Sequence, residues 1–294
     1  MVKNTGDIFL LFSHFLEKCA VPYVVVGNTE SYPERIGSDI DIVVPATDFK
    51  KIHMLVQKFA GEYCLQIVQC LQHEYCAFYF VLVFHGKGKN NGSVALDICS
   101  NYYRQGSPYI PARMLLQGRK HATNSHGQNK GFFVPAPAME FLYYMVKKIS
   151  KGPINNEQLT HLHDQFQQNP KHCIENMQLF WPAPVLVDVK LAIQNKDLQR
   201  LQELMLHLRK LLLRRCTPSP KDRIHELQRK IARFFKPTGL FMVMLGPDGA
   251  GKSSVVEEMI PQISPAFRDI HYTHLRPRLG MKKENGTAVT DPHG

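Results

Sequence analysis

Nine residues near the C-terminus, at positions 246–254, have the types and spacing of a phosphate-binding loop (P-loop): they read GPDGAGKSS and match G-x-x-x-x-G-K-S. Glycines let successive backbone N–H groups point at phosphate oxygens, and the N-terminus of a following helix adds partial positive charge. Lys252 can reach the β- and γ-phosphates, and the Ser253 hydroxyl can bind Mg²⁺. The sequence therefore predicts a site for ATP and Mg²⁺. Its residues are Gly246, Asp248, Gly249, Gly251, Lys252, Ser253 and Ser254.

A second group of residues, three aspartates in the N-terminal half, could hold metal ions. Asp39 and Asp41 are two residues apart in an apolar run, and residues two apart on a strand point to the same side. Their like charges need neutralising, and Mg²⁺ prefers carboxylate oxygens. Asp97 lies in another apolar run, where a buried, unpaired charge is costly. If the two runs form neighbouring strands, the three carboxylates make a two-metal site that activates a hydroxyl and holds a triphosphate. The alternative is a pair of surface aspartates at a strand edge.

The elements that must position these residues follow from hydrophobic periodicity and from the placing of glycine and proline. Strands are predicted at 22–27, 40–44, 63–70, 76–84, 94–99, 241–245 and 270–274. Helices are predicted at 7–19, 49–59, 137–150 and 255–260, with helical periodicity dominating 155–232. A turn is expected at 86–92 and a linker at 237–239. The strand at 241–245, the glycine loop and the helix at 255–260 come in the order that a phosphate site requires.

The aspartate pattern in the N-terminal half resembles the nucleotidyltransferase superfamily typified by DNA polymerase β. That family has an apolar strand, Gly-Gly or Gly-Ser, a spacer and then Asp-x-Asp, and here Gly27 and Asn28 precede Asp39 at a fitting interval. Asn28 replaces the second small residue, which helps to seat the triphosphate in the family. The resemblance covers about residues 7–150 and implies catalytic, metal-binding roles for Asp39, Asp41 and Asp97. Arg35 and Ser38 are candidate phosphate contacts, since arginine binds phosphate bidentately.

The helix at 137–150 ends in Lys147 and Lys148, and Lys151 follows. In proteins of the nucleotidyltransferase type, a lysine on such a helix can touch the nucleotide. A solvated basic helix end, which the helix dipole favours, is the default interpretation.

The loop at 246–254 resembles nucleoside monophosphate kinases of the thymidylate kinase type, which commonly carry Asp-Gly-Ala-Gly-Lys-Ser/Thr. The resemblance places Asp248 near the sugar of the acceptor nucleotide and Arg276, after the strand at 270–274, near the acceptor. Some members carry a catalytic arginine where this chain has Gly249, so the basic residues would come from a mobile lid. The chain ends at Gly294 without such a lid or a second metal-binding acid. We therefore expect a truncated kinase module that transfers no phosphoryl group to nucleoside monophosphates.

These observations predict an α/β protein in three parts: a nucleotidyltransferase-like α+β domain at 1–150, a helical connector at 151–236 and the start of a parallel-sheet P-loop domain at 237–294. The layout resembles bacterial proteins that pair a nucleotidyltransferase-like part with a thymidylate kinase-like part. The formal net charge of +11 favours phosphate-bearing partners. The basic segment at 209–236 is either the solvated face of two helices or a patch for nucleic acid or anionic lipid. With no bilayer-length apolar run and no secretion signal, we expect a cytoplasmic protein.

The leading hypothesis is an ATP-binding, Mg²⁺-dependent transferase, with Asp39, Asp41 and Asp97 holding metal in the first part and Lys252 acting with the loop in the second. One rival is a catalytically silent module that senses nucleotide or binds nucleic acid. Another is a nucleotidyltransferase that acts on RNA or on a protein hydroxyl, with an inert C-terminal part. The acceptor, the preferred base and the oligomeric state stay open.

Overall fold

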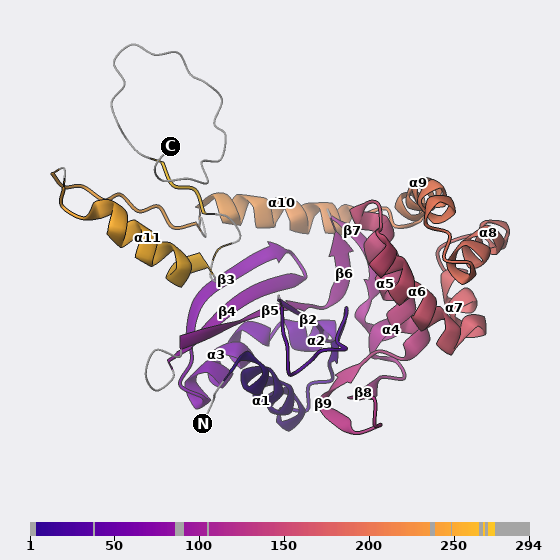
Figure 1. Cartoon of the computed structure of the whole chain (residues 1–294), viewed down its shortest axis with the longest axis horizontal. Helices are drawn as coiled ribbons and strands as arrows, with labels where there is room; N and C mark the ends of the chain where they lie inside the picture. Colours follow the sequence, from indigo (N-terminus) through magenta and orange to yellow (C-terminus); the bar gives the residue numbers. More distant parts are fainter. Residues whose placement is uncertain are drawn as a thin grey trace, which may run out of the picture. The chain divides into compact units, whose positions relative to one another are not determined.

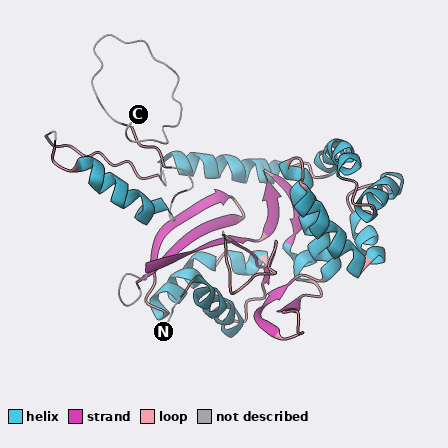
Figure 2. Ribbon diagram, viewed as in Figure 1, coloured by secondary structure: helices cyan, strands magenta, loops and turns pink. Residues whose placement is uncertain are grey.

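The structure is a computed structural model, and it describes residues 4–37, 39–85, 91–104, 106–235, 239–247, 249–264, 267 and 270–273. The chain divides into two compact units, Met1–Thr238 and Gly239–Gly294. Each unit is described by itself below. Helices and strands are mixed throughout the first unit (Figures 1 and 2), which confirms the predicted α/β class.

Within the described residues, the first unit contains a five-stranded mixed sheet with the strand order β1-β2-β5-β4-β3. β2 pairs with β5 in parallel, and the other neighbours pair antiparallel. The strands of the sheet are β1 (Val24–Val25), β2 (Ile40–Val43), β3 (Gln66–Glu74), β4 (Ala77–His85) and β5 (Asn91–Cys99). Two hairpins follow, β6 (Asn101–Arg104) with β7 (Ser107–Pro111) and β8 (Lys120–Thr123) with β9 (Asn129–Val134).

One face of the sheet is covered by α1 (Thr5–Lys18) and α3 (Ile52–Glu62), with the short α2 (Ala46–Phe49) before α3 (Figure 1). Asn4 begins α1, because its side chain accepts a hydrogen bond from the backbone N–H of Asp7. The apolar stripe of α1 then packs on alternate residues of the strands, among them Ile40 and Ile42, which are fully or almost fully buried. The burial of Ile40 and Ile42 turns the residues between and before them, Asp39 and Asp41, toward the opposite face.

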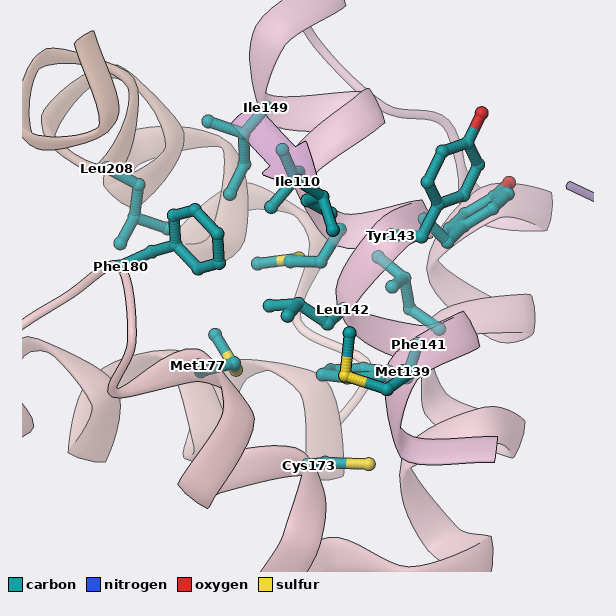
Figure 3. Close-up of a cluster of buried hydrophobic side chains, with 14 of the residues drawn as sticks. Ile110, Met139, Phe141, Leu142, Tyr143, Ile149, Cys173, Met177, Phe180 and Leu208 are labelled. Atoms are coloured by element: carbon teal, nitrogen blue, oxygen red, sulfur yellow. The ribbon is translucent and has the colours of Figure 1, made fainter. Parts of the chain in front are cut away.

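A helical subdomain follows the hairpins and carries the second hydrophobic core of the unit. Figure 3 shows Leu142, Met177 and Phe180 lying together inside this core. Trp181 is also buried there, and its indole N–H donates to the carbonyl of Leu208 at 3.0 Å. The helices after the hairpins that share this core are α5 (Pro137–Lys151), α6 (Asn156–Gln168), α7 (Pro170–Met177), α8 (Ala183–Gln194) and α9 (Leu198–Arg215). The short α4 (Ala112–Leu116) lies between the two hairpins and packs on the same core, whereas α10 (Pro220–Phe235) has no residue in it and contacts β3 instead.

The second unit has one regular element among its described residues, α11 (Lys252–Ile263). The predicted buried strand at 241–245 is wrong: these residues are irregular, and Phe241 and Leu245 are 87% and 88% exposed. A strand needs neighbours for its backbone groups, and the described residues of this unit supply none. Residues 270–273 of the predicted strand at 270–274 are also irregular. His274 and Arg276 lie outside the described residues, as do residues 86–90 of the predicted turn.

Candidate functional site

Three aspartates meet on the face of the sheet opposite α1 and α3. Asp41 of β2 and Asp97 of β5 are direct partners in the parallel register, so their side chains point the same way. Asp39 precedes Asp41 by two residues and shares that direction. One carboxylate oxygen from each lies within 4.8 Å of the others, and all three residues are half-buried. The structure thus brings together the three carboxylates that the sequence singles out.

This donor set fits a hard divalent cation. Mg²⁺ takes oxygen ligands at about 2.1 Å, so opposite ligands of one ion lie about 4 Å apart. One carboxylate oxygen of each residue of the triad lies within 4.8 Å of the others, so a small side-chain movement would let all three bind a single ion. The same separation also suits two ions about 4 Å apart. A Mg²⁺ ion in the first unit would be held by these three carboxylates.

Lys147 of α5 completes the electrostatics of the triad. Its Nζ donates a hydrogen bond to Oδ2 of Asp41 at 2.6 Å, and the Lys147 side chain is only 18% exposed. Burial lowers the pKa of Lys147, but the charge of Asp41 and the hydrogen bond to it outweigh burial and raise the pKa above its ordinary value. Lys147 is therefore an ammonium bound inside the site, which corrects the default interpretation of a solvated helix end.

His73 also contacts the triad, with its Nε2 at 3.4 Å from Oδ1 of Asp97. It lies at the register shift between Gln72 and Glu74 of β3, which pairs with β4, the neighbour of β5. His73 could not be found from the sequence, because the predicted strand at 63–70 ends before it. The three residues of β3 after Leu71 are Gln72, His73 and Glu74, and their polar types do not indicate a strand.

Gly27 lies directly beside the triad. Its φ is +106°, and a Cβ added there would be 3.6 Å from Oδ2 of Asp41. The backbone amide of Val26 donates to the carbonyl of Asp41 at 3.0 Å, which fixes this approach. A residue without a side chain therefore suits both the backbone conformation and the space that a ligand at Asp41 would need.

The other N-terminal candidates are less well placed. Arg35 is exposed, and its backbone N–H donates to Ser31 at 2.8 Å. Ser38 lies outside the described residues. Tyr32, which the sequence analysis did not select, is buried near the triad. Burial and the charges of Asp41 and Asp39 raise its pKa to about 12.

The phosphate loop lies in the second unit, while the triad lies in the first. Gly249 and Gly251 have φ values of +82° and +75°, a region that glycine adopts without strain. The Nζ of Lys252 donates to the carbonyls of Gly246 and Pro247, both at 2.7 Å. Lys252 also begins α11, as predicted for the helix after the loop. Ser253 and Ser254 are exposed in the first turn of α11, and Asp248 lies outside the described residues.

No family model matches this chain, and no curated protein matches it. Among solved structures, it is similar to the solution structure of the antibiotic-resistance factor ANT(2'')-Ia, a nucleotidyltransferase. The identity is 11% and the TM-score 0.28, over 79% of this chain and 93% of the other. A likeness this distant identifies neither a family nor an activity. In the described part of the chain, no helix is long and apolar enough to cross a bilayer.

Proposed function

We propose that the first unit is a Mg²⁺-dependent nucleotidyltransferase, which joins a nucleotidyl group from a nucleoside triphosphate to an acceptor hydroxyl. The observation that carries this proposal is the convergence of Asp39, Asp41 and Asp97 on one face of a mixed sheet. Three carboxylates and one ammonium, Lys147, leave a formal excess of two negative charges. That excess matches a divalent cation.

Each residue has a distinct task in this proposal. Asp39, Asp41 and Asp97 would hold Mg²⁺, which when bound neutralises the charge of the triphosphate and promotes ionisation of the acceptor hydroxyl. Lys147 orients the Asp41 carboxylate and lies ready to pair with a phosphate oxygen. Gly27 leaves room for the ligand beside Asp41. The acceptor hydroxyl gives its proton to solvent water, its oxygen bonds to the α-phosphorus, and pyrophosphate leaves with the electrons of the broken P–O bond.

A metal-binding experiment tests the site without knowledge of the acceptor. We expect the whole chain to bind Mn²⁺, measured by electron paramagnetic resonance, and Mg²⁺ to displace it. Asp41→Asn and Asp97→Asn should each weaken binding at least tenfold, because each removes a charged ligand. Asp188→Asn is the matched control, since Asp188 lies on α8 and pairs with Arg200 at 3.2 Å. Equal Mn²⁺ affinity in the native chain and both triad variants would exclude this metal centre.

An activity assay then separates the transferase from a silent binding module. Transfer of label from α-labelled triphosphates, with release of pyrophosphate, should require Mg²⁺ and be lost in Asp41→Asn. RNA ends and protein hydroxyls are the acceptors to supply first. Metal binding without transfer to any of these acceptors would favour the silent module.

We also propose that the second unit binds the polyphosphate of ATP through Gly246, Gly249, Gly251, Lys252 and Ser253. The left-handed glycines and the position of Lys252 over the loop carbonyls favour it. The resemblance of the loop to thymidylate kinases stays a prediction from the sequence, and so does the expectation that this unit transfers no phosphoryl group to nucleoside monophosphates. The division of the chain at residues 150 and 236 also belongs to this proposal.

A further inference from the structure

Helix α10 has its polar face toward its own unit and its apolar face outward. Asp222, Glu226 and Arg229 follow one another at spacings of four and three residues, so they share one side of the helix. All three are half-buried, whereas the other residues of α10 are exposed. An ordinary surface helix buries its apolar stripe and leaves polar groups in water. Helix α10 does the opposite.

The inner face is held by specific polar contacts. The hydroxyls of Tyr75 and Tyr103 donate to Oδ1 of Asp222 at 2.9 and 2.6 Å. Arg229 binds both carboxylate oxygens of Glu226, and its Nη1 donates to the carbonyl of Gln72 on β3 at 3.4 Å. These bonds fix the rotation of α10 along the edge strand β3. The outward direction of the apolar face is therefore built into the fold.

The outer face is a continuous apolar stripe. Three residues of the stripe each lie two positions from Asp222 or Arg229 of the inner face: Ile224, Leu227 and Ile231. Two positions correspond to about 200° around a helix, so these residues lie on its opposite side. Phe234 and Phe235 extend the stripe at its C-terminal end. The five side chains are between 50% and 81% exposed. The members of this outer stripe are Ile224, Leu227, Ile231, Phe234 and Phe235.

The charges beside the outer stripe are all positive. Lys221 flanks it on one side, and Arg223 and Lys230 flank it on the other. The two acids of α10, Asp222 and Glu226, are turned inward and occupied by the tyrosines and Arg229. An apolar stripe between rows of cations complements a surface with negative headgroups above a hydrocarbon layer.

We propose that the outer stripe of α10 docks the protein on an anionic membrane surface. The helix lies in the interface, with Leu227, Ile231 and Phe234 entering the acyl boundary and the flanking cations binding acidic headgroups. A second copy of the chain fits less well, because symmetric pairing would bring its cations against these cations. Nucleic acid fits less well, because phosphates do not desolvate isoleucine and leucine. This inference does not depend on the proposed nucleotidyl transfer.

Vesicle flotation of the whole chain tests the proposal. We expect binding to vesicles of phosphatidylcholine with phosphatidylserine, weaker binding as salt rises, and little binding to pure phosphatidylcholine. The variant with Lys221→Gln, Arg223→Gln and Lys230→Gln should bind anionic vesicles more weakly. We expect its affinity to fall about fivefold for each cation removed, or about 100-fold in all. In the variant with Leu227→Gln and Ile231→Gln, the affinity for the same vesicles should fall about tenfold or more. Leu206→Gln on α9, where Leu206 is 70% exposed, is the control that should bind as the native chain does.

A tryptophan probe keeps the test decisive if a glutamine variant misfolds. In Phe234→Trp, the new indole should shift its emission to the blue and be quenched by brominated anionic lipids, whereas Trp181 is buried and should not respond. Equal binding to neutral and anionic vesicles would overturn the proposal. Native affinity in the Leu227 and Ile231 variant would do the same. So would a dimer in solution that this variant dissociates, or salt-sensitive RNA binding without vesicle binding.

Discussion

Lys147 of α5 donates a 2.6 Å hydrogen bond to Asp41 of β2, and so joins the helical subdomain to the sheet at the candidate metal site. Both side chains are mostly shielded from solvent, at 18% and 29% exposure. When a half-buried carboxylate loses such a partner, its negative charge stays but is no longer balanced by a nearby positive charge. The pair is therefore both a structural link and part of the site.

Replacing Lys147 with methionine should lower the free energy of unfolding by about 1–3 kcal/mol in the absence of divalent ions. Saturating Mg²⁺ should recover part of that loss, because the cation then neutralises the carboxylates that have lost the ammonium. Denaturant unfolding with and without Mg²⁺ measures both quantities. Lys148→Met is the matched control on the same helix, and Mg²⁺ should not change its stability beyond the native effect. A Lys147→Met loss that Mg²⁺ leaves untouched would show that the ammonium does not share a site with the metal.

The core of this site could be predicted from the sequence because one periodicity, the alternation of side chains along a strand, identified two of its three acids. Asp39 and Asp41 are separated by Ile40 and followed by Ile42, and a strand with buried isoleucines must turn both acids the other way. The pairing of that strand with the one containing Asp97 was a condition of the metal-site hypothesis, and the cost of a lone buried acid only motivated it. The structure confirms it by the direct register of Asp41 and Asp97.

The remaining features depend on contacts between distant segments. His73 reaches Asp97 from β3 through a register shift, which no local pattern reveals. The orientation of α10 is set by Tyr75 and Tyr103, far from Asp222 in sequence. The predicted strand at 241–245 has the right composition, but its stability requires neighbouring strands. Local sequence therefore identified the chemical groups, while tertiary contacts decided how they are used.

Glu140 of α5 should make the stability of the first unit fall as pH rises from about 4.5 to about 7. Burial, reinforced by the charge of Glu30 and opposed by Lys120, raises the pKa of Glu140 from 4.5 to about 7. The folded state thus holds a proton that the unfolded state releases, so the full cost of ionisation is felt above pH 7. Glu140→Gln should remove this decline and stabilise the protein at pH 8 by up to roughly 3 kcal/mol. Urea unfolding at pH 5 and pH 8 measures the difference.

A matched acid makes the origin of that pH dependence clear. Glu175→Gln, on the exposed surface of α7, should leave the decline in place. Parallel pH profiles for the native chain and Glu140→Gln would contradict a raised pKa at Glu140.

Asp222 should hold α10 against the sheet only while it is ionised. Burial raises its pKa, but hydrogen bonds from Tyr103, Ser219 and Tyr75 outweigh burial and lower the pKa from 3.8 to about 2. A depressed acid pKa stabilises the folded state above 3.8, and the contribution is lost as pH falls toward 2. Asp222→Ala should therefore raise amide hydrogen exchange in α10 at neutral pH. Hydrogen exchange with mass spectrometry resolves this helix from the strands.

The control for this prediction is Asp188→Ala, which removes a half-buried acid from α8 and should leave exchange in α10 unchanged. Tyr103→Phe should produce a smaller increase than Asp222→Ala, because Tyr75 still donates to the carboxylate. Unchanged protection of α10 in Asp222→Ala would mean that the bond from Arg229 to the carbonyl of Gln72 suffices to hold the helix.

Lys252 should be required for nucleotide binding by the second unit. Its ammonium donates to the carbonyls of Gly246 and Pro247, in a loop whose Gly249 and Gly251 adopt left-handed conformations. A polyphosphate bound to the backbone amides of this loop would replace the carbonyls as the partner of Nζ, and a charge-assisted bond to phosphate is stronger than one to a neutral carbonyl. Lys252→Ala should therefore weaken ATP binding at least tenfold in equilibrium dialysis with labelled ATP and Mg²⁺. Lys190 is an exposed lysine on α8, and the control variant Lys190→Ala should bind ATP as the native chain does. Equal retention of ATP by the native chain and Lys252→Ala would remove the phosphate loop from the proposed function.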